Sequence, residues 1–348
     1  MKKFLGTFIF IMILLMSISA VFDLSEKIND FLAGGAPWSK IVFVYYTNFF
    51  LFYGFQFIYL INFISVIWFT SKMANDTEIV PILSAGVSFN RMLRPYFLSA
   101  LILVVGTILM TNYVLPGSNK SRIEFEASYY KSMKSSSNLR ANISEDEVLY
   151  FRNYNAITGE IINFDYQKWD GDSLEYTLNS GRAIGDSSSN KWHFDHFELR
   201  RFGEFHDELS FEYNVDTMLS FSVGDLVYNN NVIDAMNNAE LSAFIKNEKL
   251  KGSDRVPYYE IEKYKRWASP FAIFILTLIG VSVSSKKARG GLGVNIAIGL
   301  AIAVLYIFAM QMTSVAAIKV GFTPILAVWL PNIIFSIIAV FLYIRAPK

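Results

Sequence analysis

The sequence predicts a membrane-embedded α-helical protein with six transmembrane helices and an inserted all-β domain of the sandwich or jelly-roll type. Hydrophobic residues make up 53% of the 348-residue chain, and charged residues only 18%. Several apolar stretches are long enough to cross a hydrocarbon core about 30 Å thick as helices. The segment between the third and fourth of these stretches instead alternates apolar and polar residues, which is the pattern of half-buried strands.

The six apolar stretches define the expected spans. They are Phe4–Phe22, Phe52–Thr70, Tyr96–Leu115, Trp267–Ser285, Leu292–Ala317 and Ile325–Ile344. The run from Ile41 to Leu51 is also apolar, but Pro37 before it and Gly54 after it favour an interfacial helix that leads into the second span. The first span also has the basic start and small residues of a signal peptide, although its apolar run is long for one.

The basic residues of the short loops predict the orientation of the spans, because Lys and Arg accumulate on the cytosolic side. With a cytosolic N-terminus, the inner segments hold Lys2, Lys3, Lys72, Arg91, Arg94, Lys286, Lys287, Arg289, Arg345 and Lys348, and the outer short loops hold Lys27, Lys40 and Lys319. Both termini are therefore expected in the cytosol. Everything between the third and fourth spans is expected outside.

Five segments of the outer region alternate apolar and polar residues. They are 147–154, 159–169, 173–180, 191–202 and 207–213, and clusters of Gly, Asp, Asn and Ser separate them. This pattern predicts antiparallel strands joined by turns. The expected domains are 1–115 with three spans, 116–240 as the β-domain, 241–265 as a helical linker and 266–348 with three more spans. Asn237 or Asn238 is suited to cap a helix over 238–247.

The sequence offers no motif for chemistry. It has no cysteine, which excludes thiolate catalysis and cysteine-ligated metals, and the net charge of +1 gives no basic field for nucleic acid. No G-x-S-x-G, H-E-x-x-H or P-loop motif occurs. His193 and His196 lie three apart on an expected strand, so they point to opposite faces and cannot share a metal ion. We expect no catalytic residue, no metal and no cofactor in this chain.

A short amphipathic helix is predicted over residues 75–91, between the second and third spans. Asn75 or Thr77 is suited to cap it, and Gly86 to end it. Ile79, Ile82, Leu83 and Val87 fall near one face. Such a helix either docks its apolar face into a groove of a partner protein or lies on the lipid surface. The residues alone leave both interpretations open.

The order of these features resembles the LptF/LptG family, the permease subunits of the lipopolysaccharide-exporting ABC transporter. The resemblance covers nearly the whole chain. It rests on FDLSEKINDF at 22–31, NDTEIVPILSAGVSFNRMLRP at 75–95, YYEIEKYKRWASPFAIFILTLIGVSVSSKKARGG at 258–291 and VWLPNIIFSIIAVFLYIR at 328–345.

The resemblance implies that residues 75–91 form a coupling helix for an LptB-type ATPase dimer. The implied contact residues are Glu78, Ile79, Ile82, Leu83, Ala85, Gly86 and Arg91. Pro81 departs from the family's usual alanine-like interior. ATP would be used by the partner subunit and not by this chain.

The resemblance also implies a multi-pass protein of the bacterial inner membrane with a periplasmic β-jellyroll. Lipopolysaccharide would pass from a cavity shared with a second LptF/LptG-type permease, lined chiefly by the first and fifth spans, through the β-domain to LptC and LptA. Lys27, Lys40, Lys265, Arg266 and Lys319 are the candidate lipid-contacting cations. The alternatives are a membrane-anchored β-domain that binds or assembles without transport, and a membrane enzyme. A membrane-anchored β-domain would need only one span. A membrane enzyme would need charged residues within the spans for its chemistry, and these spans have none.

Overall fold

The computed structural model describes residues 1–129, 136–144, 146–155, 159–185, 190–203, 206–221, 233–250, 252–253, 255–285 and 292–346. It divides into a helical unit (Met1–Phe125, Ile233–Ser242 and Pro257–Lys348) and a β unit (Glu126–Val232 and Ala243–Val256). Four basic residues used above for the orientation, Lys286, Lys287, Arg289 and Lys348, lie outside the described residues.

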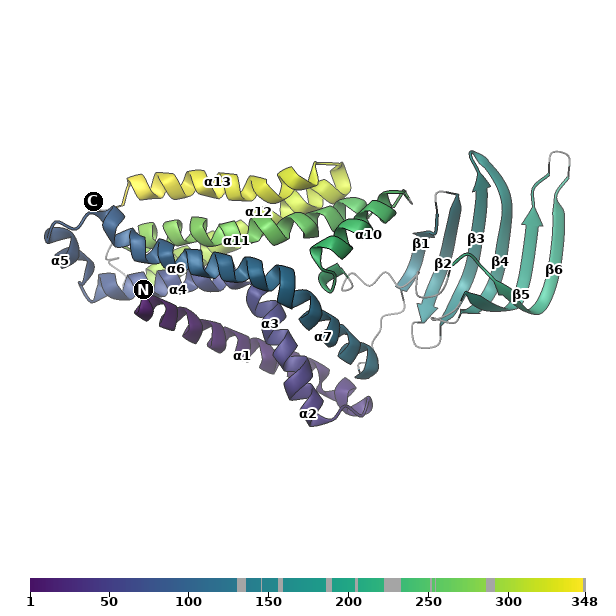
Figure 1. Cartoon of the computed structure of the whole chain (residues 1–348), viewed down its shortest axis with the longest axis horizontal. Helices are drawn as coiled ribbons and strands as arrows, with labels where there is room; N and C mark the ends of the chain where they lie inside the picture. Colours follow the sequence, from purple (N-terminus) through teal and green to yellow (C-terminus); the bar gives the residue numbers. More distant parts are fainter. Residues whose placement is uncertain are drawn as a thin grey trace. The chain divides into compact units, whose positions relative to one another are not determined.

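The helical unit contains the expected membrane spans (Figure 1). Its main helices are α1 (Lys2–Ala33), α4 (Ile58–Asn75), α6 (Phe89–Leu109), α11 (Val256–Ser284), α12 (Leu292–Val320) and α13 (Pro324–Ile344), with the short α5 (Ile79–Ser84) after α4. Among the described residues, five helices are long and apolar enough to cross a membrane, and a bent pair makes up to six. The prediction of a helical membrane protein with six spans is confirmed if the bent pair counts as one span.

The bent pair forms the second span and the segment that leads into it. The short α2 (Trp38–Lys40), the π-helical η1 (Ile41–Tyr46) and α3 (Thr47–Gln56) precede α4, which leaves their direction by 69°. Phe57, at the break, has φ −102° and ψ 12°, outside the helical region. The sequence placed the second span at residues 52–70, whereas α4 runs from Ile58 to Asn75, because the chain turns at Phe57 and not at Gly54.

Helix α4 is the central helix of the unit, since it contacts both α1 and α12. Two glycines allow close approach to it: a Cβ on Gly299 of α12 would lie 2.0 Å from Ile67 Cδ1, and one on Gly280 of α11 would lie 2.8 Å from Val66 Cγ1. Small residues let membrane helices approach closely in this way. Asn62 on α4 also donates to Thr277 Oγ1 on α11 over 2.9 Å.

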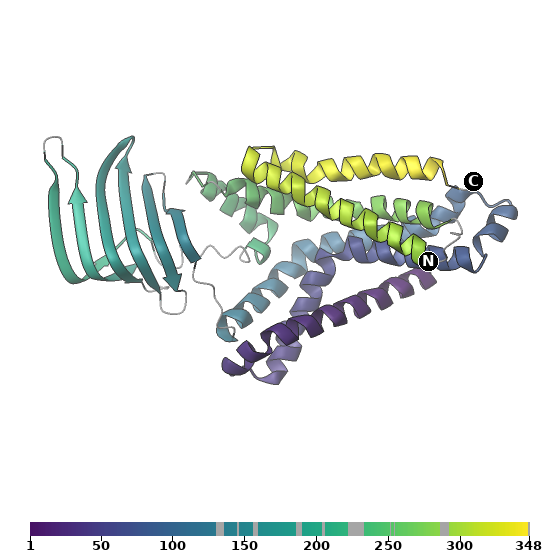
Figure 2. The ribbon, with the colours of Figure 1, turned by 180° about the vertical axis from the view of Figure 1, so that it is seen from behind.

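A second buried polar contact joins α11, α12 and α13. Tyr306 on α12 donates to Asn332 Oδ1 on α13 over 2.8 Å, and the Asn332 amide donates to the Ala268 carbonyl on α11 over 3.1 Å. Polar groups in apolar surroundings are costly unless they are hydrogen-bonded, so this contact fixes the three helices in register. Figure 2 shows the unit from behind, with α12 and α13 side by side.

The β unit contains a six-stranded antiparallel sheet. Its strands are β1 (Ser136–Asn142), β2 (Glu147–Asn155), β3 (Glu160–Asp170), β4 (Ser173–Gly185), β5 (Lys191–Arg201) and β6 (Glu208–Met218), and neighbours in sequence pair with one another. The inserted all-β domain is thus confirmed, and each of the five predicted strands is present. Among the described strands the order is a simple meander in one sheet, without the crossover between two sheets that defines a jelly roll.

The core of the sheet depends on a break in strand alternation. Ile161 and Phe164 on β3 are both buried although they are three residues apart. Asn163 between them has φ 55°, in the left-handed region, and this resets which side chains face inward. The core also includes Tyr166 and Trp192, whose indole N–H donates to the Phe221 carbonyl over 2.9 Å.

Two helices flank the strands in sequence. The third span continues through η2 (Met110–Val114) into α7 (Leu115–Tyr129), so the first strand begins well after residue 116. Helix α10 (Asn238–Leu250) begins where the sequence predicts. Asn237 Oδ1 accepts from the backbone N–H of Ala239 and Glu240, and the Glu240 carboxylate accepts from the Asn237 N–H. This reciprocal cap makes Asn237, and not Asn238, the capping residue.

Candidate functional site

Helix α5 is shorter than the helix predicted over residues 75–91. It spans only Ile79–Ser84, because Thr77 before it has φ 56° and Gly86 after it has φ 81°. Neither Asn75 nor Thr77 caps it: Glu78 occupies the N-cap position, without a side-chain cap hydrogen bond. Pro81 lies in the first turn, where a missing N–H leaves no helix bond unmade. Arg91 belongs to α6, whose N-cap is Ser88.

The apolar face of α5 packs on its own chain. Ile79 is 2% exposed and belongs to a core cluster with Phe4, Val66 and Phe89, and the half-buried Leu83 packs against the same cluster. Ile82 and Val87 are half-buried. The face that the sequence assigns to a partner therefore holds α5 against α1, α4 and α6.

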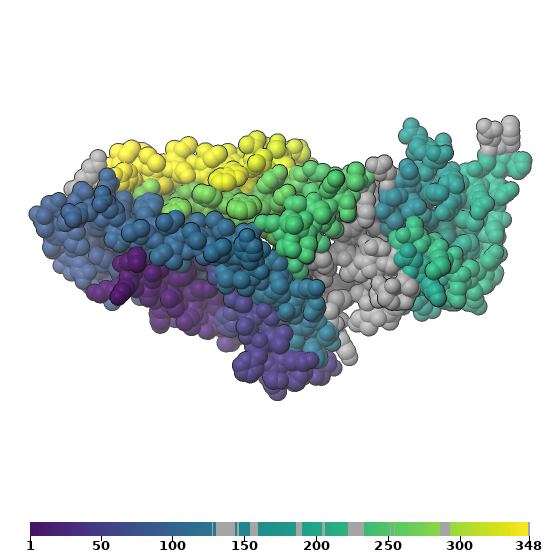
Figure 3. Space-filling model, in the orientation of Figure 1, coloured from purple at the N-terminus to yellow at the C-terminus, as the bar shows by residue number. Residues whose placement is uncertain are grey.

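The opposite face of α5 is open to a partner. Val80 is 65% exposed, and Glu78, Pro81, Ser84 and Ala85 are exposed as well. In the space-filling view this segment forms one end of the helical unit (Figure 3). Both chain termini lie at this same end (Figure 1). We use the name docking face for Glu78, Val80, Pro81, Ser84 and Ala85.

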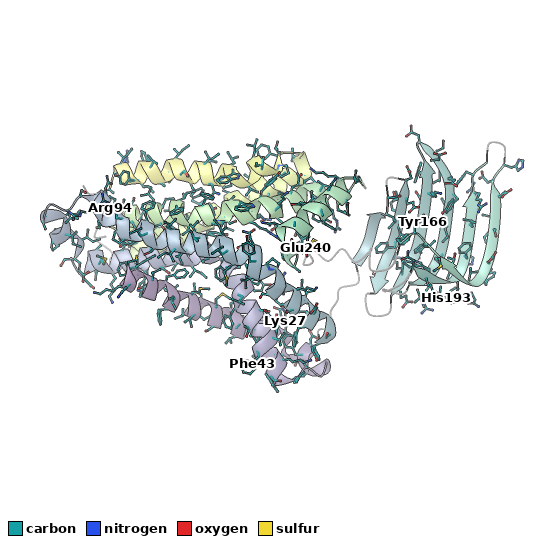
Figure 4. All side chains as sticks on the ribbon, in the orientation of Figure 1. Lys27, Phe43, Arg94, Tyr166, His193 and Glu240 are labelled. Carbon is teal, nitrogen blue, oxygen red and sulfur yellow. The ribbon has the colours of Figure 1, made fainter. Side chains whose placement is uncertain are left out.

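The candidate lipid-contacting cations do not form one cluster. Lys27 on α1 pairs with Asp23 at 3.0 Å and donates to the Tyr45 hydroxyl over 2.5 Å, so its ammonium is engaged with neighbours of its own chain. Figure 4 shows Lys27 toward the end of the helical unit opposite to Arg94, which is one of the basic residues expected on the cytosolic side. Lys40 and Lys319 are exposed. Lys265 and Arg266 are half-buried on α11, beside a cavity.

This cavity lies within the helical unit and has a volume of about 300 Å³. Phe52 and Phe57 line it from the bent pair, and Ile307 and Met310 from α12. Its polar lining includes Asp234, Glu262, Lys265 and Arg266. We use the name charged cavity for this space. No periodic pattern or motif in the sequence marks Asp234 as a site residue.

Hydrogen bonds hold residues 233–238, the segment that follows the β-strands, against α11 beside the charged cavity. Arg266 donates to Asn238 Oδ1 over 3.0 Å and to the Ile233 carbonyl over 3.0 Å. The Asn238 amide in turn donates to Asn112 Oδ1. Lys265 pairs with Glu262 at 2.8 Å. Burial, and secondly the nearby Glu262 carboxylate, raise the pKa of Asp234 to about 6, although Arg266, Arg122 and Lys265 oppose the shift.

Replacing Asp234 with Asn is expected to stabilise the protein at neutral pH. Because the native pKa of Asp234 lies above the 3.8 of the free side chain, the folded state binds the proton more tightly. The protonated Asp234 contributes fully to the free energy of unfolding below about pH 4, and this contribution is lost as the pH rises through about 6. A shift of this size corresponds to an advantage for the neutral amide on the order of 2–3 kcal/mol at pH 8.

Thermal unfolding in lipid-free detergent between pH 4 and pH 8 measures this effect. The two proteins should have similar stability near pH 4, diverge as the pH rises from about 4 to about 6, and keep a nearly constant difference at higher pH. A difference that is the same at every pH would contradict the assignment to the Asp234 carboxyl.

The β unit presents an open edge. Strand β6 ends the sheet among the described strands, and Leu209, Phe211 and Tyr213 on it are 52%, 53% and 72% exposed. An edge strand offers unpaired backbone groups to a strand of another protein. Figure 4 places Tyr166 and His193 in this unit.

The two histidines on β5 have different surroundings. His193 Nδ1 lies 2.7 Å from Asp216 Oδ1, whereas His196 contacts the rings of Phe211 and Tyr213. Within the described residues no group of three His, Cys, Asp or Glu side chains is placed to hold a metal ion.

One family model matches the chain over almost its whole length. Its description is lipopolysaccharide export system permease LptF/LptG, and the match covers residues 1–345. No curated protein matches the chain.

Proposed function

The chain belongs to the LptF/LptG family of lipopolysaccharide export permeases, and we propose that it passes lipopolysaccharide outward in response to a cytosolic ATPase that docks on α5. As a member of this family it is a permease of the lipopolysaccharide export system, a non-catalytic multi-pass membrane subunit.

The observation that carries the proposal is the position of α5 at the end of α4. Helix α5 is fixed to the bundle by Ile79 and Leu83, and its docking face is exposed. A partner that displaces α5 therefore displaces α4. Because α4 contacts both α1 and α12, the displacement reaches both of these helices. Each has only 22% of its most apolar stretch buried by its own chain, so both are among the spans least covered by the chain itself.

We place the docking face in the cytosol, against one subunit of an LptB-type ATPase dimer that uses the ATP. The bias of the short-loop basic residues supports this orientation, as does the position of both termini beside α5. The exposed faces of α1 and α12 suit a second LptF/LptG-type permease, with lipopolysaccharide between the two chains. Lys40, the last residue of α2, and Lys319, in the last turn of α12, are exposed and suit the phosphates of lipopolysaccharide.

Beyond the membrane, the β unit is proposed to receive the lipid in the periplasm and to pass it to LptC and LptA. Tyr176 and Phe197 are only partly buried against its aromatic core and offer apolar contacts to acyl chains. The open edge of β6 suits strand addition by the next β-domain of such a bridge.

Photo-crosslinking in the reconstituted transporter tests the lipid path. Crosslinkers replace Phe22 on α1, Val320 on α12 and Tyr176 in the β unit, and Val340 on α13 serves as the lipid-facing control. Lipopolysaccharide is expected at positions 22 and 320 without hydrolysis, and at position 176 only with hydrolysable ATP. Equal labelling at position 340, or nucleotide-independent labelling at position 176, would contradict the path.

A further inference from the structure

The charged cavity contains a carboxyl group that lacks a hydrogen-bond partner among the described residues. Asp234 lines the cavity and is largely buried, and its interactions with Glu262, Arg266, Arg122 and Lys265 are electrostatic only. A buried carboxylate is costly unless it accepts hydrogen bonds or pairs with a cation. Its oxygens therefore favour a ligand that brings a charged N–H donor into the cavity.

The other charges of the cavity restrict that ligand. Asp234 and Glu262 contribute two negative charges, and Lys265 and Arg266 two positive ones. One Glu262 oxygen is engaged by Lys265, and two Arg266 N–H groups are engaged by Asn238 and Ile233. Both cations retain further N–H groups, because an ammonium has three and a guanidinium five. The charges that line the cavity are thus balanced, and the lining offers both donors and acceptors.

The remainder of the lining is largely apolar, with six uncharged polar residues: Gln56, Thr107, Thr111, Ser269, Gln311 and Ser314. Phe52, Phe55 and Phe57 come from the bent pair, and Ile307 and Met310 from α12. A cavity of about 300 Å³ is at the lower end of ligand-binding pockets, which range from about 300 to 1,000 Å³. An amphiphile with a small dipolar head and an alkyl chain matches this division between charged and apolar surfaces.

We propose that the charged cavity binds a zwitterionic aminophospholipid. Its primary ammonium donates to the Asp234 carboxylate, its phosphate accepts from Lys265 and Arg266, and one acyl chain lies along the phenylalanines of the bent pair. This lipid is a resident of the helical unit and not the exported cargo, so the inference does not depend on the transport path proposed above.

Charge and donor count distinguish this ligand from other lipids. An anionic lipid without an amine leaves Asp234 unpaired and brings its negative charge beside two carboxylates. A choline headgroup carries the same charges as an aminophospholipid, but its nitrogen has no N–H to donate. A hydrogen bond to a charged group contributes about 1.5–3 kcal/mol, which corresponds to roughly 10- to 100-fold in affinity.

Native mass spectrometry of the full chain, titrated with lipids of identical acyl chains, tests the proposal. Phosphatidylethanolamine is expected to bind at least about tenfold more tightly than phosphatidylglycerol or phosphatidylcholine. Asp234→Asn should lower the affinity for phosphatidylethanolamine to that for phosphatidylcholine. Asp170→Asn, the same chemical change on an exposed residue at the end of β3, should leave all three affinities unchanged.

A second variant tests the cavity without altering a charge. Ser269 lines it, and Ser269→Phe should fill it and remove the bound phosphatidylethanolamine. Thermal unfolding of each variant shows that it is folded before the titration. Equal binding of the three lipids by the native chain, or unchanged lipid selectivity in folded Asp234→Asn, overturns the proposal. Retained phosphatidylethanolamine binding in folded Ser269→Phe places the lipid elsewhere and overturns it as well.

Discussion

Replacing Val80 with arginine is expected to detach the ATPase from an otherwise intact permease. Val80 is 65% exposed at the centre of the docking face, so its replacement leaves the core cluster beneath α5 unchanged. A bulky charge at the centre of a docked surface typically costs about 2 kcal/mol or more, a loss of roughly 30-fold in affinity. ATP-driven lipid transfer should fall at least as far.

Copurification of the ATPase with the tagged permease, followed by an affinity measurement in detergent, checks this result. Val80→Ile keeps an apolar side chain of similar shape and is the matched control. Leu83→Arg is a poor test, because the half-buried Leu83 packs on the core and its replacement unfolds the region as well. If folded Val80→Arg retained full ATPase binding and turnover, the docking face would be misassigned.

Replacing Gly159 with alanine is expected to destabilise the β unit by about 2–5 kcal/mol. Gly159 has φ +67°, and a Cβ there would lie 2.2 Å from the Gly185 carbonyl oxygen. The left-handed conformation costs a non-glycine residue about 1–2 kcal/mol, and overpacking adds about 1–3 kcal/mol. The obstacle is a backbone atom, and the Gly159 carbonyl also accepts from the Gly185 N–H over 3.0 Å, so β3 and β4 cannot separate cheaply.

Gly171 is the matched control for this substitution. It has φ +59° in the turn between β3 and β4, but a Cβ there meets nothing within 4 Å. Gly171→Ala should therefore cost only the conformational part, about 1–2 kcal/mol. Limited proteolysis and thermal unfolding of the full chain measure both losses. Equal destabilisation by the two substitutions would show that the Gly185 carbonyl moves aside.

Hydropathy and alternation predict most of the fold, because both are properties of the residues that form each element. The spans and five of the six strands follow from these patterns. Strand β1 has the sequence SSNLRAN, which is too polar to show alternation, and it is held by pairing with β2. Helix α7 was missed for a related reason: its sequence LPGSNKSRIEFEASY has neither a continuous apolar run nor a regular apolar stripe.

The candidate site was harder to predict than the fold. An amphipathic pattern identifies the buried face of α5 but not whether its own chain or a partner covers that face. Ile79 and Leu83 turn out to be covered by the chain itself. Likewise, Asp234 reaches the charged cavity only because the chain returns there from the β unit, and no local pattern reports such a distant contact.

Among the described strands, β6 leaves one edge of the sheet unpaired, and this edge also affects how the cell handles the subunit. Any copy made in excess of its partners would expose an apolar strip on this edge strand, formed by Leu209, Phe211 and Tyr213. Exposed apolar edge strands promote aggregation. Synthesis matched in number to the rest of the assembly would keep that strip covered. Surplus copies should then be the first to be lost to aggregation or degradation.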